Sequence, residues 1–155
     1  MKKEKQKSQF QLKVNFNFKA VNNKTGKIIQ QVSCNTIVDD GLERVAKLLN
    51  GVLTTPYTVL AIGTGTTAVT TSDSVLETEV KRETATTSYE ANFKAKFEHT
   101  FIFNSGESFS ITEAGIFDSP IISGSTILNR TVFTEIIVNV DIDLITTATI
   151  TVARI

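Results

Sequence analysis

Apolar and polar residues alternate without a break near the start of the chain. From Phe10 to Lys19 every second residue is apolar, and the residues between them are Gln, Lys or Asn. This period of two predicts a β-strand with one buried and one solvated face. The turn-forming residues 22–26 follow, so residues 28–35 are expected to return as a second strand.

Extended patterns continue through most of the chain. We expect further strands at residues 57–62, 89–103, 109–117, 126–134, 138–144 and 146–155. The pattern of residues 75–87 is ambiguous and favours an extended segment.

The longest of these strands, residues 89–103, carries an apolar face rich in aromatic side chains. It would span about 50 Å at the usual rise of a strand, which is more than a small sandwich needs. We therefore expect part of it to project and to pair with a neighbouring subunit. The side chains that would form this interface are Phe93, Phe97, Phe101 and Phe103.

Residues 39–51 contain the one convincing helical pattern. Asp39 or Asp40 is expected to cap the N-terminus, and Gly51 suits the stop. A helix this short is marginal alone, so its apolar stripe should lie against a sheet. The stripe consists of Leu42, Val45, Ala46 and Leu49.

Together these elements predict an all-β fold, an antiparallel β-sandwich with jelly-roll or Greek-key connections and one short α-helix near residues 40–50. Neither an internal repeat nor a strand–helix–strand alternation is seen. A chain of 155 residues suffices for one domain that buries about 70% of its unfolded surface. We expect this domain to cover residues 10–155, after a basic arm of residues 1–9.

The charge of the chain limits its partners. The 16 Lys and Arg residues balance 16 Asp and Glu residues, whereas a dedicated nucleic-acid-binding protein usually carries a basic face. The start of the chain is the exception, because it holds Lys2, Lys3, Lys5 and Lys7. Either this arm only adds solubility, or it reaches onto an acidic neighbour as a tether to a larger particle.

No apolar run approaches the ~18 residues of a membrane span. The basic start leads into alternating Phe and polar residues rather than into the apolar stretch of a signal peptide. We therefore expect the chain to remain in the cytoplasm where it is made until it assembles, without membrane association.

Residues suited to catalysis are scarce. His99 is the only histidine and Cys34 the only cysteine. His99 falls on the apolar face of the longest predicted strand, which favours a structural role. Because no second His and no nucleophile motif accompany it, we expect no catalytic residue, no metal site and no cofactor.

Three further groups have simple structural interpretations. Residues 63–67, GTGTT, lack the Lys and the following helix of a phosphate-binding loop, so they predict a turn at a strand end. Asp141 and Asp143 share one face of a strand but lack the other oxygen ligands of a calcium site. Ordinary exposed ion pairs are expected among Glu77, Glu79, Lys81, Arg82 and Glu83.

Two stretches carry a resemblance. The first is YTVLAIGTGTT at residues 57–67, followed by Asp73, Leu76 and EVKR at residues 79–82. The second is ITEAGIFD at residues 111–118, followed by GSTILNRTVF at residues 124–133. They resemble the IGTGTT…E…R strand-loop and the EAGIF…L.R..F hairpin of small virion proteins of tailed bacteriophages. The resemblance covers roughly residues 37–155.

This resemblance implies a non-enzymatic structural component of a virion, made in the cytoplasm of a bacterial host. A capsid decoration or head-fibre protein is preferred. The alternative is a tail, baseplate or fibre protein with recognition of a host-surface glycan, although most Phe residues alternate inward and Trp is absent. The implied partners are major capsid or tail proteins and further copies of the chain, with a trimer favoured. An enzyme such as a small hydrolase is the least favoured class.

Overall fold

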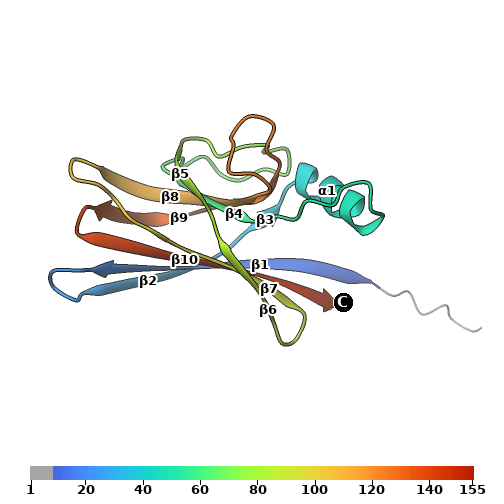
Figure 1. The fold of residues 1–155 in the computed structure, drawn as a ribbon, viewed down its shortest axis with the longest axis horizontal. Coiled ribbons are helices and arrows are strands. Elements are labelled where there is room, and N and C mark those ends of the chain that lie inside the picture. Colours follow the sequence, from blue (N-terminus) through green and yellow to red (C-terminus); the bar gives the residue numbers. More distant parts are fainter. Residues whose placement is uncertain (1–8) are drawn as a thin grey trace, which may run out of the picture.

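The computed structural model describes residues 9–155 and confirms the predicted all-β sandwich. Two antiparallel sheets of five strands each form its two layers (Figure 1). The four basic residues Lys2, Lys3, Lys5 and Lys7 lie outside the described residues, so the tethering role stays a prediction.

Sheet 1 has the strand order β2-β1-β10-β7-β6. Its strands are β1 (Phe10–Asn22), β2 (Ile28–Cys34), β6 (Thr86–Glu90), β7 (Lys94–Phe101) and β10 (Ile142–Arg154). Sheet 2 has the order β3-β9-β8-β4-β5. Its strands are β3 (Thr36–Ile37), β4 (Val59–Gly63), β5 (Glu79–Thr84), β8 (Ser108–Phe117) and β9 (Ile127–Asn139). The single helix in the described chain, α1 (Asp39–Leu49), joins β3 to β4.

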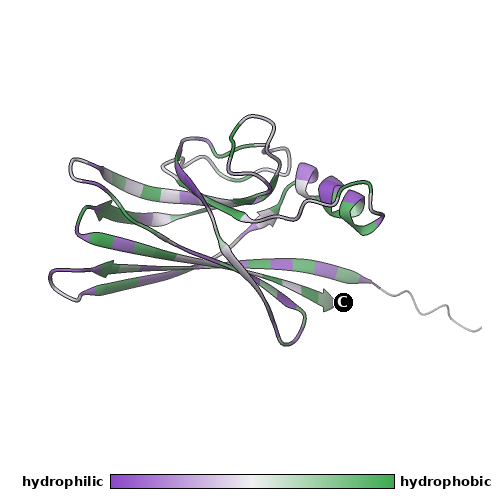
Figure 2. Ribbon diagram, viewed as in Figure 1, coloured by the Kyte–Doolittle hydropathy of each residue, from purple (hydrophilic) through white to green (hydrophobic). Residues whose placement is uncertain are grey.

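The period-two alternation places one face of each sheet in a shared core. Figure 2 shows the alternating apolar and polar bands along β1 and β10. Phe16 and Phe18 of β1 are fully buried, and the Phe18 ring stacks on Phe133 of β9 with centroids 4.1 Å apart. Burial of each such side chain stabilises the fold by roughly 1.5–3 kcal/mol. The same cluster contains Leu60, Ile62, Phe97, Phe101, Ile111, Ile116, Val138 and Leu144.

At two places the chain runs directly from an edge strand of one sheet into an edge strand of the other, and these crossings close the sides of the sandwich. β2 of sheet 1 continues through Asn35 into β3 of sheet 2, and β5 of sheet 2 continues through Ala85 into β6 of sheet 1. Figure 1 shows the second crossing in front of the sandwich. Strands that switch sheets in this way form the corners of sandwiches, so the chain itself ties the two layers together on both sides.

The strand predicted over residues 89–103 is interrupted, and that prediction is wrong in this respect. β6 ends at Glu90 and β7 starts at Lys94, and these two residues lie opposite each other in a hairpin. Asn92 and Phe93 adopt positive φ angles of 65° and 63°, the left-handed conformation that tight hairpin loops use. The loop contains neither Gly nor Pro, so the apolar alternation runs through it without a turn signal.

The strand predicted over residues 138–144 is also wrong, because a second hairpin lies there. β9 ends at Asn139 and β10 starts at Ile142. Asp141, expected on a solvated strand face, lies in the turn, and its carboxylate pairs with the Lys24 ammonium at 3.0 Å. Its carbonyl oxygen also accepts a hydrogen bond from the N–H of Asn23 at 2.8 Å. Asp141 therefore joins the β9–β10 turn to the β1–β2 turn.

Helix α1 docks on a different face from the one that its hydrophobic pattern predicts. Leu42 and Leu49, expected against a sheet, are exposed, Leu49 by 76%. The buried positions of the helix are Gly41 and Arg44, and the half-buried Val45 and Leu48 pack beside the core. Of the predicted stripe, Val45 alone makes this contact.

Gly41 explains this change of face. A Cβ atom at Gly41 would lie 2.2 Å from the carbonyl oxygen of Leu128 in β9, so only glycine lets the helix backbone approach this strand. The N-cap is Val38, which makes no side-chain capping bond. The capping role predicted for Asp39 and Asp40 is therefore wrong. Both lie in the first turn, where negative charge still favours the helix dipole.

Candidate functional site

The most deeply buried ion pair in the described chain lies within the second of the two stretches that carry the phage resemblance. Glu113 of β8 is 0% exposed and Arg130 of β9 is 3% exposed. The Arg130 Nε donates to the Glu113 Oε2 at 2.8 Å. These two residues, with Asp73 and Glu77 of the loop between β4 and β5, are called the Glu113 cluster here.

The Glu113 carboxylate is saturated with hydrogen bonds. Its Oε1 accepts from the backbone N–H groups of Gly65 at 3.0 Å and Thr78 at 2.7 Å. Its Oε2 accepts from the N–H of Glu77 at 3.0 Å in addition to Arg130. A carboxylate offers about four acceptor positions, so Glu113 has no capacity left to act as a general base. It fastens the loop of residues 64–78, called the 64–78 loop, to sheet 2.

The Arg130 guanidinium also forms hydrogen bonds through each of its nitrogens. Its Nη1 donates to Asp73 at 2.9 Å, and its Nη2 donates to Glu77 at 3.3 Å. With Nε on Glu113, all three guanidinium nitrogens hold carboxylates of the same chain. Arg130 lines a shallow surface pocket but presents no unused nitrogen there for an anionic ligand.

The glycines of the GTGTT segment make room for this carboxylate. A Cβ atom at Gly65 would lie 2.6 Å from the Glu113 Oε1, and one at Gly63 would lie 2.5 Å from the same atom. The Thr112 hydroxyl adds a 2.8 Å hydrogen bond to the Gly65 carbonyl oxygen. β4 ends at Gly63, which agrees with the predicted turn at a strand end. The glycines thus accommodate a buried glutamate rather than a phosphate.

The two loop carboxyls have lowered pKa values. Burial alone would raise the pKa of Asp73, but hydrogen bonds from Thr70 and Arg130 outweigh it and hold this pKa below its ordinary value. Hydrogen bonds from the hydroxyl and the N–H of Thr67, together with Arg130, lower the pKa of Glu77. Both groups therefore bind protons less readily in the folded chain than in the unfolded one.

Acid is expected to weaken the cluster. Because the folded-state pKa values of Asp73 and Glu77 are depressed, their contribution is complete above the ordinary carboxyl pKa of about 4 and is lost as the pH falls through the lower folded values. Urea unfolding measured at a series of pH values should show this loss. A double variant, Asp73→Asn with Glu77→Gln, should lose less stability in acid than the wild type. An equally steep acid limb in the variant would contradict the assignment.

A second cluster surrounds Arg82 of the EVKR run. Its Nε and Nη2 bind both carboxylate oxygens of Glu79 at 2.6 and 2.7 Å. Its Nη1 donates to the Ser119 carbonyl and the Ser125 hydroxyl at 3.0 and 2.9 Å, and the guanidinium lies 4.2 Å from the Phe117 ring centroid. The exposed pairing expected for Glu79 and Arg82 is therefore wrong, since both side chains are largely buried.

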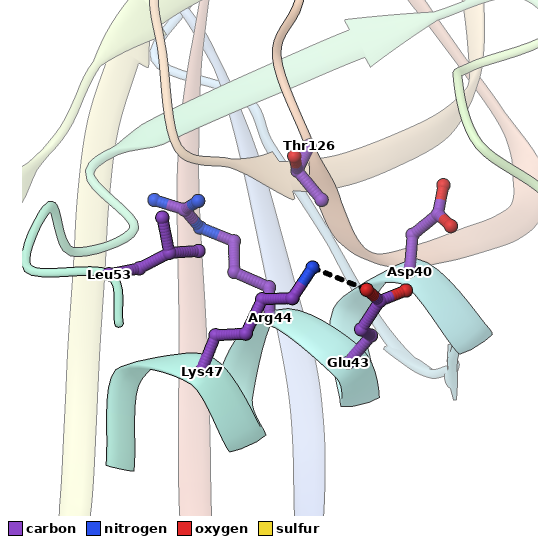
Figure 3. Close-up of a pocket in the computed structure, with 6 residues that line it drawn as sticks. All are labelled: Asp40, Glu43, Arg44, Lys47, Leu53 and Thr126. Carbon is purple, nitrogen blue, oxygen red and sulfur yellow. Dashed lines mark hydrogen bonds and ion pairs between the residues drawn. The ribbon is translucent and has the colours of Figure 1, made fainter. Parts of the chain in front are cut away.

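A third cluster anchors the helix. Arg44 of α1 pairs with Asp118, which follows β8, at 3.0 Å, and each side chain is 9% exposed. Arg44 also donates to the Thr55 carbonyl oxygen at 2.6 Å and lies over the ring of Tyr57. Burial raises the pKa of the Tyr57 hydroxyl well above its ordinary value. Figure 3 shows the Arg44 side chain leaving the helix, whereas Lys47 bends along the helix surface to Glu43.

The four Phe residues proposed as a subunit interface are separated by the structure. Phe97, Phe101 and Phe103 are buried in the core of the sandwich, because they face sheet 2 and not a neighbouring molecule. Phe93 alone of the four is open to a partner, at 69% exposure. It lies in the loop of the β6–β7 hairpin.

Within residues 9–155 no group of three His, Cys, Asp or Glu side chains has the arrangement of a metal site. His99 lies half-buried in β7 with its ring edge-on to Phe101, 4.8 Å between centroids. In the same part of the chain, no helix is long and apolar enough to cross a membrane. Cys34 is the last residue of β2.

The sequence did contain a signal for the Glu113 cluster. Glu113 and Arg130 are the single charged residues in two segments rich in apolar residues, ITEAGIF and ILNRTVF, on two strands that pair in a hairpin. Opposite charges in neighbouring buried strands predict an ion pair, because a buried charge needs a partner. Arg44 gave no such signal, since a charged residue on a short helix is normally solvated.

No protein-family model, no curated protein and no solved structure matches the chain.

Proposed function

We propose that the protein is a non-enzymatic structural component of a tailed bacteriophage virion, with a capsid decoration or head-fibre role preferred to a tail or baseplate role. One observation carries the proposal. The charged residues of the two resembling stretches are used up in internal contacts, as Glu113, Arg130 and Arg82 demonstrate. A motif whose charged groups hold the fold together suits a protein that works by its shape and surface.

The proposed partners are major capsid or tail proteins, together with further copies of the chain. The protein would be made in the bacterial cytoplasm and would act in the virion. Its balanced charge, with 16 basic and 16 acidic residues, supports contact with proteins in preference to nucleic acid.

Immunogold electron microscopy tests the proposal. Antibodies against the purified chain would be applied to purified particles of the phage whose genome encodes it. Gold on the heads of the particles is the expected result, and gold on tails or baseplates would support the alternative position. Purified particles that contain none of the chain by mass spectrometry would overturn the proposal.

A second candidate, recognition of a host-surface glycan, is favoured by one observation. Three aromatic side chains are exposed at one end of sheet 1, namely Phe10, Tyr89 and Phe93. Phe10 and Phe93 line a groove with Asn92 and Arg154, and exposed aromatic rings beside polar groups suit sugar stacking. A glycan array probed with the wild type and with Phe93→Ala tests this candidate. Array signals that the variant abolishes would support it, and an array without signals would remove it.

A further inference from the structure

The four edge strands of the sandwich differ in their protection against pairing with other chains. Proteins usually blunt a sheet edge with charge, proline or short length. β5 carries three consecutive charged residues, Lys81, Arg82 and Glu83. β3 is two residues long, and β6 ends in Glu90, which pairs with Lys96 at 3.7 Å. Each of these three edges is protected in some way.

β2 lacks all such protection. Its sequence, IIQQVSC, contains no charged residue, no Pro and no Gly, and it is an end strand of sheet 1. Ile28, Ile29 and Val32 are all more than half exposed. An uncharged strand of seven residues with exposed apolar side chains at a free edge is a template for strand pairing.

Side chains on the inner face of β2 form hydrogen bonds with β9. Gln31 lies opposite the core residue Phe18 in the β1–β2 register and so points toward sheet 2. The Gln31 side-chain amide, oriented with its nitrogen toward the Thr134 carbonyl, donates to that carbonyl and accepts from the Thr134 N–H, each at 2.9 Å. The Ser33 hydroxyl forms a 2.5 Å hydrogen bond with the Thr131 hydroxyl of β9, and either hydroxyl can be the donor. β2 therefore caps the flank of β9, and its own outer edge faces away from the sandwich (Figure 1).

We propose that β2 pairs antiparallel with β2 of a second copy of this chain, about a two-fold axis that passes through Gln30. In this register Ile28 lies opposite Val32 of the second copy, and Val32 lies opposite the second Ile28. All four side chains are on the outer face of sheet 1, because Ile28 and Val32 share the side of β2 away from the core.

The same register explains why the occupant is another copy. Gln30 meets its own equivalent across the axis. Its Nε2 donates to the Asn17 Oδ1 at 3.1 Å, so the amide oxygen and the second N–H of the Nε2 group are the atoms that can bond to the second copy. Lys27, the charged residue next to β2, faces Ser33 of the second copy, so like charges do not meet. The β2 sequence is thus complementary to itself when reversed. The contact joins two five-stranded sheets into one continuous sheet.

A two-fold axis produces dimers and not the trimer that the sequence favoured. The contact consists of one strand pair with a few apolar side chains, so it is small and we expect a dimer of micromolar affinity. It does not depend on a role in a virion. If the chain dimerises but is absent from purified phage particles, this inference stands and only the proposed function is overturned.

Light scattering over a concentration series tests the contact. The wild type should approach twice the mass of the 17.0-kDa chain. Val32→Lys should raise the dimer dissociation constant by at least about tenfold, because each dimer loses two apolar cross-strand pairs. Ile137→Lys is the matched control, since Ile137 of β9 and Val32 are each 63% exposed; this variant should dimerise as the wild type does. A monomeric or trimeric wild type, or a Val32→Lys chain that dimerises normally, would overturn the proposal.

Disulfide cross-linking locates the axis independently. In a Cys34→Ser background, Gln30→Cys should form covalent dimers on mild oxidation, because residues facing each other across antiparallel strands lie about 4.5–5.5 Å apart at Cα, within the range of a disulfide. Ser88→Cys, on the opposite edge of sheet 1, is the control and should remain unlinked. Equal cross-linking of both variants, or none in Gln30→Cys, would contradict the register.

Discussion

Replacing Glu113 with alanine is expected to lower the free energy of unfolding by about 3–5 kcal/mol, because removal of one partner leaves the other buried charge uncompensated. Arg130, at 3% exposure, would retain only the loop carboxylates Asp73 and Glu77. The N–H groups of Gly65, Glu77 and Thr78 would also lose their acceptor. A loss of this size corresponds to a decrease of roughly 6–20 °C in Tm for a domain of this length.

Urea and thermal unfolding followed by circular dichroism would measure the change. Glu135→Ala is the matched control, because Glu135 is an exposed glutamate on β9 and should change stability by less than about 0.5 kcal/mol. Glu113→Gln should fall between the two, since it keeps an acceptor oxygen and removes the charge. A Glu113→Ala chain within about 1 kcal/mol of the wild type would show that the cluster contributes little to stability.

The same cluster accounts for the composition of the resembling stretches. Gly63 and Gly65 are required by the space that the Glu113 carboxylate occupies. Arg130 follows because a buried carboxylate needs a buried cation. The spacing of the stretches therefore describes one packing arrangement, in which the 64–78 loop is held on sheet 2. Such an arrangement can serve any protein that needs a rigid edge, which is why the resemblance bears on shape and not on chemistry.

Strands with one buried and one solvent-exposed face were predictable from the sequence. β1 and its partner β10 bury alternate residues, and the period of two reports this directly. β8 is different, because its residues 111–117 are buried on both faces. There the period of two is lost, and Glu113 among mostly apolar residues could have been recognised as a residue that needs a partner.

The β6–β7 hairpin could not be found from the pattern. Apolar residues alternate through the turn from Tyr89 to Ala95, and these two residues face each other across the hairpin. Asn92 and Phe93 take left-handed backbone conformations that glycine usually provides. The local preference of Phe93 is overridden by the pairing of the flanking strands, so propensity alone favours one long strand.

The prediction of the docking face of α1 was wrong for a related reason. A hydrophobic stripe predicts which face a helix buries only when apolar contact dominates the docking. Here close backbone approach at Gly41 and a buried arginine decide the orientation. The stripe is left facing a groove that Leu42 and Leu49 share with Phe10 and Ile37. Neither glycine nor arginine contributes to an apolar pattern, so the true face could not be deduced from it.

Arg44→Ala should therefore be nearly as damaging as the loss of Glu113, lowering the free energy of unfolding by about 3–5 kcal/mol. Asp118, at 9% exposure, would be left buried without a cation. The guanidinium of Arg44 also lies over the Tyr57 ring, with its Cζ 5.4 Å from the ring centroid, and this cation–π contact would be lost. Lys47→Ala is the control on the same helix, since Lys47 pairs with Glu43 at the surface (Figure 3) and should change stability by less than about 0.5 kcal/mol.

A double variant separates charge from packing. Arg44→Met keeps most of the apolar stem, and Asp118→Asn keeps the oxygen that accepts the 2.7 Å hydrogen bond from the Thr126 N–H. Because both charges leave together, the double variant should be at least about 1 kcal/mol more stable than the sum of the two single losses implies. Losses that simply add would mean that Arg44 and Asp118 act independently, and the helix would then be held by Gly41 and its apolar neighbours alone.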